Sequence, residues 1–485
     1  MTNARPGSMP AADGATALPA EAGHPARAFA LLGAVQVTLV FTITLIAVPL
    51  PAIGREFGLD HSSLILASTA YGLSFSGLLL FGGRLADRRG ARAVLTVGLV
   101  VFAVASSVAA AAPAFAVLVA ARFAQGAGAA LVAPPAMAVL RAITPDEASH
   151  ARALASWGGL SVLGATAGIL LSGVVTTWVS WRWMFAVALL VSVVSLLLIP
   201  RWLPPVAPSG RAALDLPGAA LATAGVTLLS YGLVVTDGHA WSSAAVVVPL
   251  ATGLALLTAF AAAELRNRDP LLPPAFLAYR RRATALLAIA FSAAGTAVTF
   301  LFLTLYLQQA RGWTPLRTSL AFAPYALSLI TIGRLASRLV VRFGARAVAG
   351  AGLAIAATGL FLLAQLSPHT AYATGLLPGI VLLPAGAALA FAGAAVLAVG
   401  GVPQQQAGLA GGVMNTAMEL GPTLGLALLT AVAAARASHA TAAGASPQAA
   451  TISGYAWALG AAGLAFALLA VLTAIPVPPA TRRSG

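Results

Sequence analysis

The chain has 485 residues, of which 60% are hydrophobic and only 8% are charged, and its mean hydropathy is +0.93. An ordinary soluble domain carries about 25% charged residues, so this composition excludes one and indicates a polytopic membrane protein. The lack of cysteine excludes disulfides and thiolate metal sites. The net charge of +15 comes entirely from arginines that stand between apolar stretches, which is typical of membrane-protein loops and argues against nucleic-acid binding.

The first 27 residues are rich in Pro, Ala and Gly and lack an apolar core, so we expect a disordered tail. The next apolar stretch is longer than a signal-peptide core of about 7–15 residues, and we expect it to be retained. Further apolar windows of about 20 residues follow one another to the end of the chain. They predict an all-α fold of fourteen membrane-spanning helices, which start near residues 28, 64, 93, 114, 152, 181, 214, 243, 283, 316, 345, 373, 408 and 453.

The positions of the arginines test this number independently of hydropathy. If both termini are cytoplasmic, the predicted inside segments hold 21 of the 27 basic residues, and Arg122 falls within a helix. The outside loops hold only Arg55, Arg182, Arg311, Arg317 and Arg436. Because positive residues concentrate in cytoplasmic loops, we expect a multi-pass protein of the cytoplasmic membrane with both termini inside.

An internal repeat divides the chain. The stretch Gly-Arg-Leu-Ala at 83–86 recurs at 333–336, and Gly-Ala-Arg-Ala-Val at 90–94 recurs at 344–348. A parallel duplication explains such a pattern. It predicts a tail at 1–27, a six-helix bundle at 28–200, a two-helix insertion at 201–282, a second six-helix bundle at 283–474, and a cytoplasmic tail at 475–485.

Three motifs carry a resemblance to a known family. Residues 83–92, GRLADRRGAR, resemble the signature loop of the major facilitator superfamily between its second and third helices. Residues 118–128, LVAARFAQGAG, resemble the fourth-helix motif of its proton-driven exporters. Residues 180–185, SWRWMF, resemble the junction of the fifth and sixth helices in the fourteen-helix drug/proton antiporter branch. The resemblance implies a major facilitator fold with helices arranged 6 + 2 + 6.

The loop motif contains Gly83, Asp87, Arg88, Gly90 and Arg92. Its glycines permit a tight turn, and its arginines hold the loop in the cytoplasm. The resemblance assigns its charges to a gate that opens and closes during transport. A topology anchor without a gating role remains the alternative.

Two charged residues are candidates for proton coupling. Arg122 lies in mid-helix, where a charge is costly, and the resemblance assigns it to coupling; bonding to backbone carbonyls is the structural alternative. Glu419 is an acid within a predicted span, and a buried carboxyl group suits a reversible proton carrier. A water-accessible position near the helix end remains equally open for it.

The sequence departs from the antiporter pattern at two places. Thr42 stands in helix 1 where these exporters carry an aspartate, which leaves the usual coupling chemistry without its acid and favours neutral or anionic compounds. The fifth-helix motif normally has Gly-Pro, whereas this chain has Gly164-Ala165 followed by Gly168. Gly421-Pro422 occurs instead in helix 13, and these small residues also suit simple helix packing.

Polar and aromatic residues within predicted spans are candidates for a substrate pocket, although each alone is more often packing. They are Gln36, Thr42, Tyr71, Gln125, Tyr325 and Asn415. The histidines fall in loops or the tail, so we expect neither a metal site nor a catalytic residue.

The leading hypothesis is a secondary transporter that exports small amphipathic organic compounds, such as an antibiotic, drug or secondary metabolite, in exchange for protons. It would need no cofactor besides the proton gradient, and we expect a monomer in the lipid bilayer. A major facilitator uptake symporter or uniporter for a small metabolite is the alternative. A membrane-integral transferase is more remote, because no predicted loop gathers a catalytic constellation.

Overall fold

The computed structural model describes residues 25–59, 61–144, 146–206, 208, 216–237, 239–266, 279–400 and 407–475. Within these ranges the chain is helical and contains no strand, as predicted. The first half contains the helices α1 (Pro25–Thr44), α2 (Leu50–Phe57), α3 (His61–Arg89), α4 (Ala91–Ala110), α5 (Phe115–Ala130), α6 (Ala133–Ile143), α7 (Glu147–Trp178) and α8 (Arg182–Trp202).

The remaining helices belong to an inserted pair and to the second half. The inserted pair is α9 (Leu216–Val234), which ends in the short η1 (Val235–Asp237), and α10 (Ala244–Arg266). The second half contains α12 (Arg280–Leu305), η2 (Tyr306–Ala310), α13 (Pro315–Ala321), α14 (Ala323–Phe343), α15 (Ala345–Leu363), η3 (Tyr372–Leu376), α16 (Leu377–Val399), α17 (Ala407–Ala442) and α18 (Pro447–Ala474).

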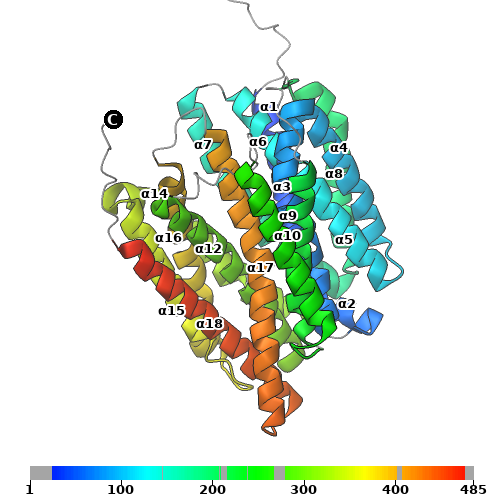
Figure 1. Cartoon of the computed structure of the whole chain (residues 1–485), viewed down its shortest axis with the longest axis vertical. Coiled ribbons are helices and arrows are strands. Elements are labelled where there is room, and N and C mark those ends of the chain that lie inside the picture. The colour runs from blue at the N-terminus through cyan, green and yellow to red at the C-terminus, as the bar shows by residue number, and fades with distance from the viewer. Residues whose placement is uncertain are drawn as a thin grey trace, which may run out of the picture.

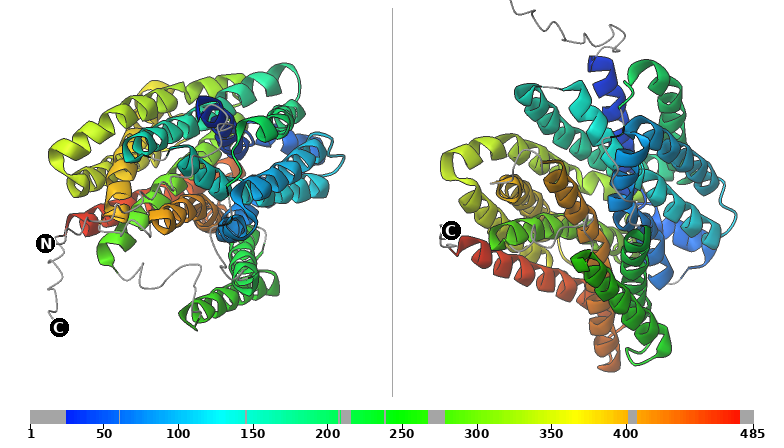
Figure 2. Two further views of the ribbon diagram at one scale, coloured as in Figure 1. Left: turned by 90° about the horizontal axis from the view of Figure 1, so that it is seen from above. Right: turned by 45° about the horizontal axis from the view of Figure 1, so that its top comes forward.

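The two halves are helix bundles with corresponding neighbours, and they stand side by side in Figure 1. In the first half, α4 packs against α5 and α8, and α1 packs against α7. In the second half, α15 packs against α16 and α18, and α12 packs against α17. The α9–α10 pair projects from the bundles, as the left view of Figure 2 shows, and α9 contacts both α3 and α17.

Local signals explain where several helices begin and break. The side chain of Asp146 accepts a hydrogen bond of 2.8 Å from the backbone N–H of Ser149 and caps α7, and Ser446 caps α18 in the same way. The break between α5 and α6 precedes Pro134 and Pro135, whose first-turn positions suit a helix start. A similar break before Pro324 separates α13 from α14.

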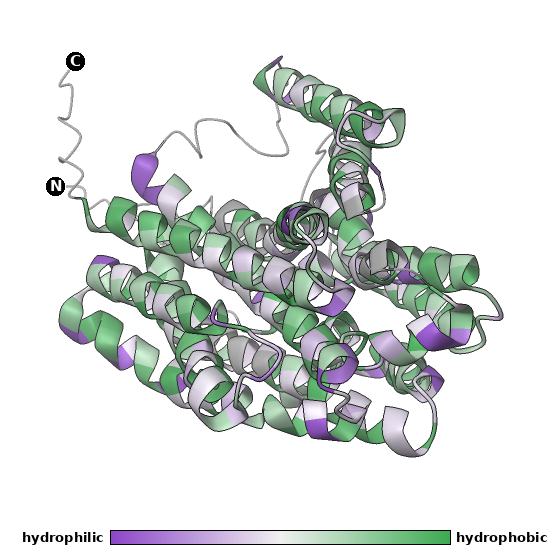
Figure 3. Ribbon diagram, turned by 90° about the horizontal axis from the view of Figure 1, so that it is seen from below, coloured by the Kyte–Doolittle hydropathy of each residue, from purple (hydrophilic) through white to green (hydrophobic). Residues whose placement is uncertain are grey.

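Hydrophobic residues cover most of the helices, and hydrophilic ones are few (Figure 3). In the described part of the chain, eleven helices are long and apolar enough to cross a membrane, and a twelfth qualifies if the bent pair Leu66–Leu79 and Phe81–Arg89 is one span. The shorter apolar helices Leu163–Trp178 and Ala220–Leu233 lie within the predicted fifth and seventh spans. The all-α polytopic fold is therefore confirmed, whereas the number fourteen stays a prediction.

The helices run between two opposite ends of the molecule, and each end is named after a residue that lies there. The beginning of α1 lies at the same end as the α3–α4 turn (Figure 1), and we call it the Asp87 end. The opposite end contains α2 and the turn between α7 and α8, and we call it the Glu56 end.

Among the described residues, the halves are in contact at the Glu56 end. One hydrophobic core joins them and includes Leu50, Ile53 and Trp181 of the first half with Phe302 and Tyr306 of the second. A separate core contains first-half residues alone, and it extends toward the Asp87 end through residues such as Ala86 and Val94. The described part of the chain therefore closes the arrangement at the Glu56 end.

Candidate functional site

Arg122 lies on α5 and is fully buried in the first half, with 0% of its surface exposed. Its Nη1 donates a hydrogen bond of 2.8 Å to the backbone carbonyl of Thr42 on α1. Its guanidinium group stands 5.1 Å from the ring centre of Tyr71 on α3, a favourable cation–π position. Nε and Nη2 have no hydrogen-bond partner among the described residues. A buried cation so incompletely paired is energetically costly, which points to a functional reason for keeping it.

Thr42 receives this bond through its backbone rather than its side chain. The hydroxyl group of Thr42 donates to the carbonyl of Thr38 at 2.8 Å and is itself fully buried. The position where the resemblance to antiporters predicted an aspartate therefore presents a neutral carbonyl dipole to Arg122. For Arg122 the sequence left open a structural alternative, in which the guanidinium group bonds to backbone carbonyls. The observed bond to the Thr42 carbonyl has this geometry.

Gln125 lies on the same helix but faces another neighbour. Its side-chain nitrogen Nε2 donates to Ser106 Oγ on α4 at 2.8 Å, and its oxygen Oε1 has no partner in the described part of the chain. Gly126 permits the close approach of α3, because a Cβ there would overlap the backbone oxygen of Tyr71 and Ser74 Oγ. The structure thus places Gln125 between α4 and α5, within the packed first half.

A shallow depression on the first half has room for little more than one water molecule, about 20 Å³. It is lined by Gln36, Leu39, Val40, Ile43, Phe75, Ala133, Met137 and Trp157. Gln36 supplies the amide group of this lining, and its Nε2 donates to Ser161 Oγ at 2.9 Å. The sequence predicted Gln36 as a pocket residue but missed Phe75, Met137 and Trp157, since apolar residues in an apolar span give no separate signal. The depression is too small in this state for a drug-sized ligand, but its lining combines apolar and aromatic side chains with a hydrogen-bonding amide.

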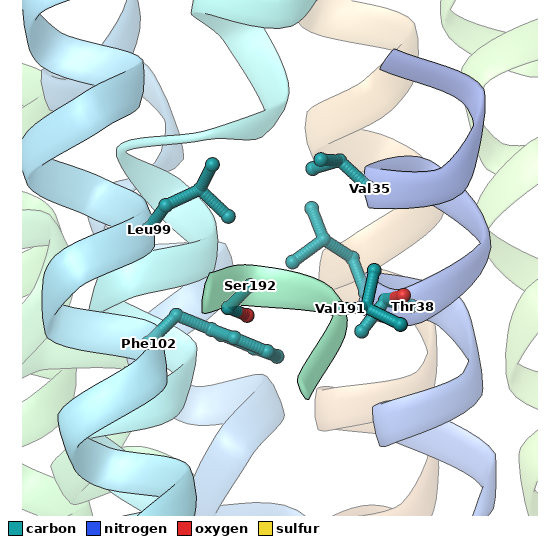
Figure 4. A pocket seen from close by; sticks show the side chains of 7 residues that line it. Val35, Thr38, Leu99, Phe102, Val191 and Ser192 are labelled. Atoms are coloured by element: carbon teal, nitrogen blue, oxygen red, sulfur yellow. The ribbon is translucent and has the colours of Figure 1, made fainter. Parts of the chain in front are cut away.

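A second, narrower space lies between α1, α4 and α8 and is too small to hold a water molecule. Figure 4 shows Val35 and Leu99 facing one another across it, with Phe102 below. Its two hydroxyl groups, those of Thr38 and Ser192, already donate to carbonyls of their own helices at 2.8 and 2.7 Å. This space therefore reflects helix packing rather than a ligand site.

In the second half, Tyr325 is almost fully buried within an aromatic group. Its hydroxyl donates to Thr296 Oγ1 at 2.8 Å, and its ring centre lies 4.7 Å from that of Phe300. Phe322 packs edge-on against Phe300 at 4.9 Å. The structure places Tyr325 in the core that unites the halves.

The predicted gating loop forms the turn between α3 and α4. Gly90 occupies this turn with φ of 89°, a backbone conformation that favours glycine. Asp87 and Arg88 are exposed, whereas Gly83 and Arg92 are half-buried. The loop thus stands at the surface of the Asp87 end, where the sequence placed it.

The motif glycines lie at matching contacts in the two halves. A Cβ at Gly164 of α7 would come within 2.5 Å of the Val37 carbonyl on α1, and one at Gly168 would meet Thr44 Oγ1. Gly421 of α17 similarly faces the Ala290 carbonyl on α12. Pro422 is a half-buried residue inside α17. These small residues allow close helix contact in both halves.

Two candidates lie outside the description of side chains. Glu419 and Asn415 are both on α17, but their side chains are not among the described ones. Around Arg122, the described part of the chain supplies backbone carbonyl, aromatic and amide groups. Within the described residues, no group of three or more His, Asp or Glu side chains could hold a metal ion.

Comparisons with known proteins place this geometry in context. A family model described as the Major Facilitator Superfamily matches residues 30–426 and 285–484. The chain is 38% identical over 450 residues to the cephamycin export protein CmcT of Amycolatopsis lactamdurans, covering 92% of this chain and 91% of the relative. It is 37% identical over 448 residues to the puromycin resistance protein pur8 of Streptomyces alboniger, covering 90% and 88%.

A solved structure supports the same fold. The chain is similar to the crystal structure of PepTSo, a POT family transporter, with a TM-score of 0.65. The likeness covers 92% of this chain and 98% of that one at 15% sequence identity. At this identity the likeness concerns the arrangement of the helices.

Proposed function

Because the chain belongs to the major facilitator superfamily, in its branch of drug and antibiotic efflux transporters, we propose that it exports small amphipathic organic compounds in exchange for protons. The observation that carries this proposal is the 38% identity over nearly the whole chain to a protein named as a cephamycin exporter. The substrate would be an antibiotic, a drug or a secondary metabolite. A membrane-integral transferase is set aside, because this family and the named relatives are transporters and resistance proteins.

Alternating access follows from the two-bundle architecture. The arginine distribution favours cytoplasmic termini, so the Asp87 end would face the cytoplasm and the Glu56 end the outside. Contact between the halves at the Glu56 end then corresponds to a state closed to the outside. Rocking of the two bundles would open this contact and release the substrate.

The depression on the first half is the proposed substrate surface. Its lining combines the Trp157 indole, the Phe75 ring and aliphatic side chains with the single amide of Gln36. Such a surface favours an amphipathic compound with an aromatic or aliphatic body. Since no charged residue lines it, the charge of a substrate would be sensed elsewhere.

We place proton coupling at Arg122 and Glu419. Arginine stays protonated in proteins, so the reversible carrier would be the carboxyl group of Glu419. Arg122 would act through its fixed positive charge, because Thr42 supplies no carboxylate to neutralise it. An uptake symporter or uniporter would have the same fold but would carry its substrate into the cell. The relative that is named as an export protein favours export over this alternative.

Transport by everted membrane vesicles tests this function. A pH gradient would be imposed on vesicles containing the protein, with a panel of cationic, neutral and anionic antibiotics. We expect substrate accumulation that collapses when the gradient is dissipated, and no accumulation in vesicles without the protein. Accumulation that ignores the gradient would overturn proton antiport, and a Glu419→Gln variant with unchanged pH dependence would remove that residue as the carrier.

A further inference from the structure

A cluster at the Glu56 end connects three loops of the first half. The carboxylate of Glu56, on α2, accepts a hydrogen bond from Trp181 Nε1 at 2.7 Å and pairs with Arg182 Nη1 at 2.6 Å. Arg182 Nη2 donates at 3.0 Å to the carbonyl of Ala112, between α4 and α5. We call Glu56, Trp181 and Arg182 the Glu56 clasp.

Aromatic contacts reinforce the clasp. The guanidinium carbon of Arg182 stands 4.4 Å from the Trp181 ring centre. The same indole packs edge-on against Phe57 at 6.2 Å and Phe185 at 6.0 Å. Burial alone would raise the pKa of Glu56, but the hydrogen bonds from Trp181 and Arg182 and the charge of Arg182 hold it below its ordinary value. The carboxylate therefore stays ionised at neutral pH.

The segments joined by the clasp also make two of the contacts between the halves. The α1–α2 turn, which leads directly to Glu56, presents the Val48 carbonyl to Gln308 Nε2 of η2 at 2.8 Å. The helix α7, which leads directly to Trp181, brings Gly173 against Ser319 and Pro315 of α13. Both contacts thus lie on segments that end at the clasp.

We infer that the Glu56 clasp is a positioning device that binds the α1–α2 turn and the end of α7 into one rigid block. The two contacts with the second half then form and break together. Without the clasp, each segment could leave its partner separately, and the two contacts would break independently of one another. This inference rests on the proposed alternating access, since only a chain whose halves separate needs such a block.

The absence of cysteine from the chain makes a direct test possible. Single cysteines replace Val48 and Ser319, which are both 0% exposed in the closed arrangement and lie on the two contacts. Their reaction rates with a small maleimide are measured on the full chain in lipid nanodiscs. This readout requires neither a substrate nor a pH gradient, so a failure of the proposed antiport leaves it unaffected.

Glu56→Gln and Arg182→Gln are the test variants. Since hydrogen bonds to charged groups stabilise more than neutral ones, and since each segment can leave its partner separately once the clasp is lost, we expect each variant to raise the rate at each of the two positions by about tenfold, with no requirement that the two rates stay equal. The matched control is Arg436→Gln, because Arg436 also stacks on an indole, that of Trp457, and bonds Ser453. It touches neither contact, and we expect both rates to stay unchanged.

A third cysteine separates loss of the clasp from general unfolding. Ala129 is 0% exposed within the first half and lies outside both contacts, so its cysteine must remain unreactive in every variant. Faster labelling at Val48 and Ser319 alone supports the inference. Unchanged labelling, a response at only one of the two positions, or equal exposure of position 129 would overturn it.

Discussion

The two copies of the repeated turn share a backbone but differ in chemistry. Gly90 has φ of 89° and ψ of 133°, and Gly344 has φ of 84° and ψ of 147°, each directly before a helix that starts with alanine. Yet a Cβ at Gly90 would lie 3.1 Å from the Val206 carbonyl, whereas no described residue lies within 4 Å of one at Gly344. Asp87 of the first copy corresponds to Ser337 of the second. The duplication therefore kept the turn and its arginines, but only the first half has the acidic residue and, among the described residues, the close packing.

The helices behind these turns show the same asymmetry. α5 follows α4 and carries the buried Arg122, whereas α16 follows α15 in the second half and contains no charged residue. The first half thus holds the costly charge, and its counterpart is apolar. Four experiments test this asymmetry.

The largest effect is expected at Arg122. Arg122→Met removes the charge at similar volume, and we expect gradient-driven export to fall by about a hundredfold, the size of the effect when one preorganised electrostatic group is lost. Stability should change by less than about 2 kcal/mol, because replacing an incompletely paired buried charge by an apolar side chain is often neutral. Vesicle transport and thermal unfolding measure the two quantities. A large loss of thermal stability together with a normal transport rate per folded protein would instead show that Arg122 has a structural role.

The next effect concerns the loops. Asp87→Asn should leave membrane insertion intact and lower transport at least about tenfold, since a single lost charge-assisted interaction is worth that much. Ser337→Asn places the same side chain at the corresponding position and should leave transport unchanged. Transport rates per inserted protein provide the measurement. Normal transport in Asp87→Asn would reduce the first loop to a topology anchor.

A smaller effect is expected on stability, when the glycines of the two turns are replaced. Gly90→Ala and Gly344→Ala both force an alanine into a glycine conformation, at a cost of about 1–3 kcal/mol. We expect the larger loss of stability at Gly90, where the added Cβ also meets the Val206 carbonyl. Thermal unfolding in detergent compares them, and equal losses would mean that the extra contact relaxes without cost.

The smallest effect is a pH dependence. Because the folded pKa of Glu56 lies below its ordinary value of 4.5, its ion pair stabilises the clasp at neutral pH and loses this effect only as the pH falls through that lowered pKa. The indole N–H resonance of Trp181, assigned by its loss in Trp181→Phe, should stay constant around neutral pH and shift only in acid, as the pH falls through the lowered pKa of Glu56.

Two comparisons control the pH experiment. In Glu56→Gln the Trp181 resonance should not depend on pH. The Trp457 resonance reports the Arg436 stack of the second half and should also remain constant. A shift of the Trp181 resonance near neutral pH would contradict the lowered pKa.

Much of the fold could be predicted from the sequence, because apolar spans and glycine turns are local signals. The spacing placed Gly90 and Gly344 in equivalent turns, and the arginine motif singled out a residue that is indeed buried. The exposure of the Asp87 loop followed from its charges. Such features depend on neighbours within a few residues.

Contacts between distant segments were not predictable. Glu56 and Arg182 are 126 residues apart, and the only signal was that both stood in predicted outside loops with opposite charge. Gln125 looked like a pocket residue, but its orientation toward Ser106 depends on how α4 packs. Nothing in the sequence indicated that the Thr42 backbone would receive Arg122.

The contact of Gly173 with Ser319 has a consequence for the energy of opening. Small residues bring the two backbones close together but hide little apolar surface per contact, and hydrophobic stabilisation scales with the area hidden, at about 25 cal/mol per Å². Gly72, which meets Thr423 across the halves, follows the same rule. These small-residue contacts are therefore close-fitting yet add little to the free energy of separating the halves, which is what the proposed alternating access requires of them.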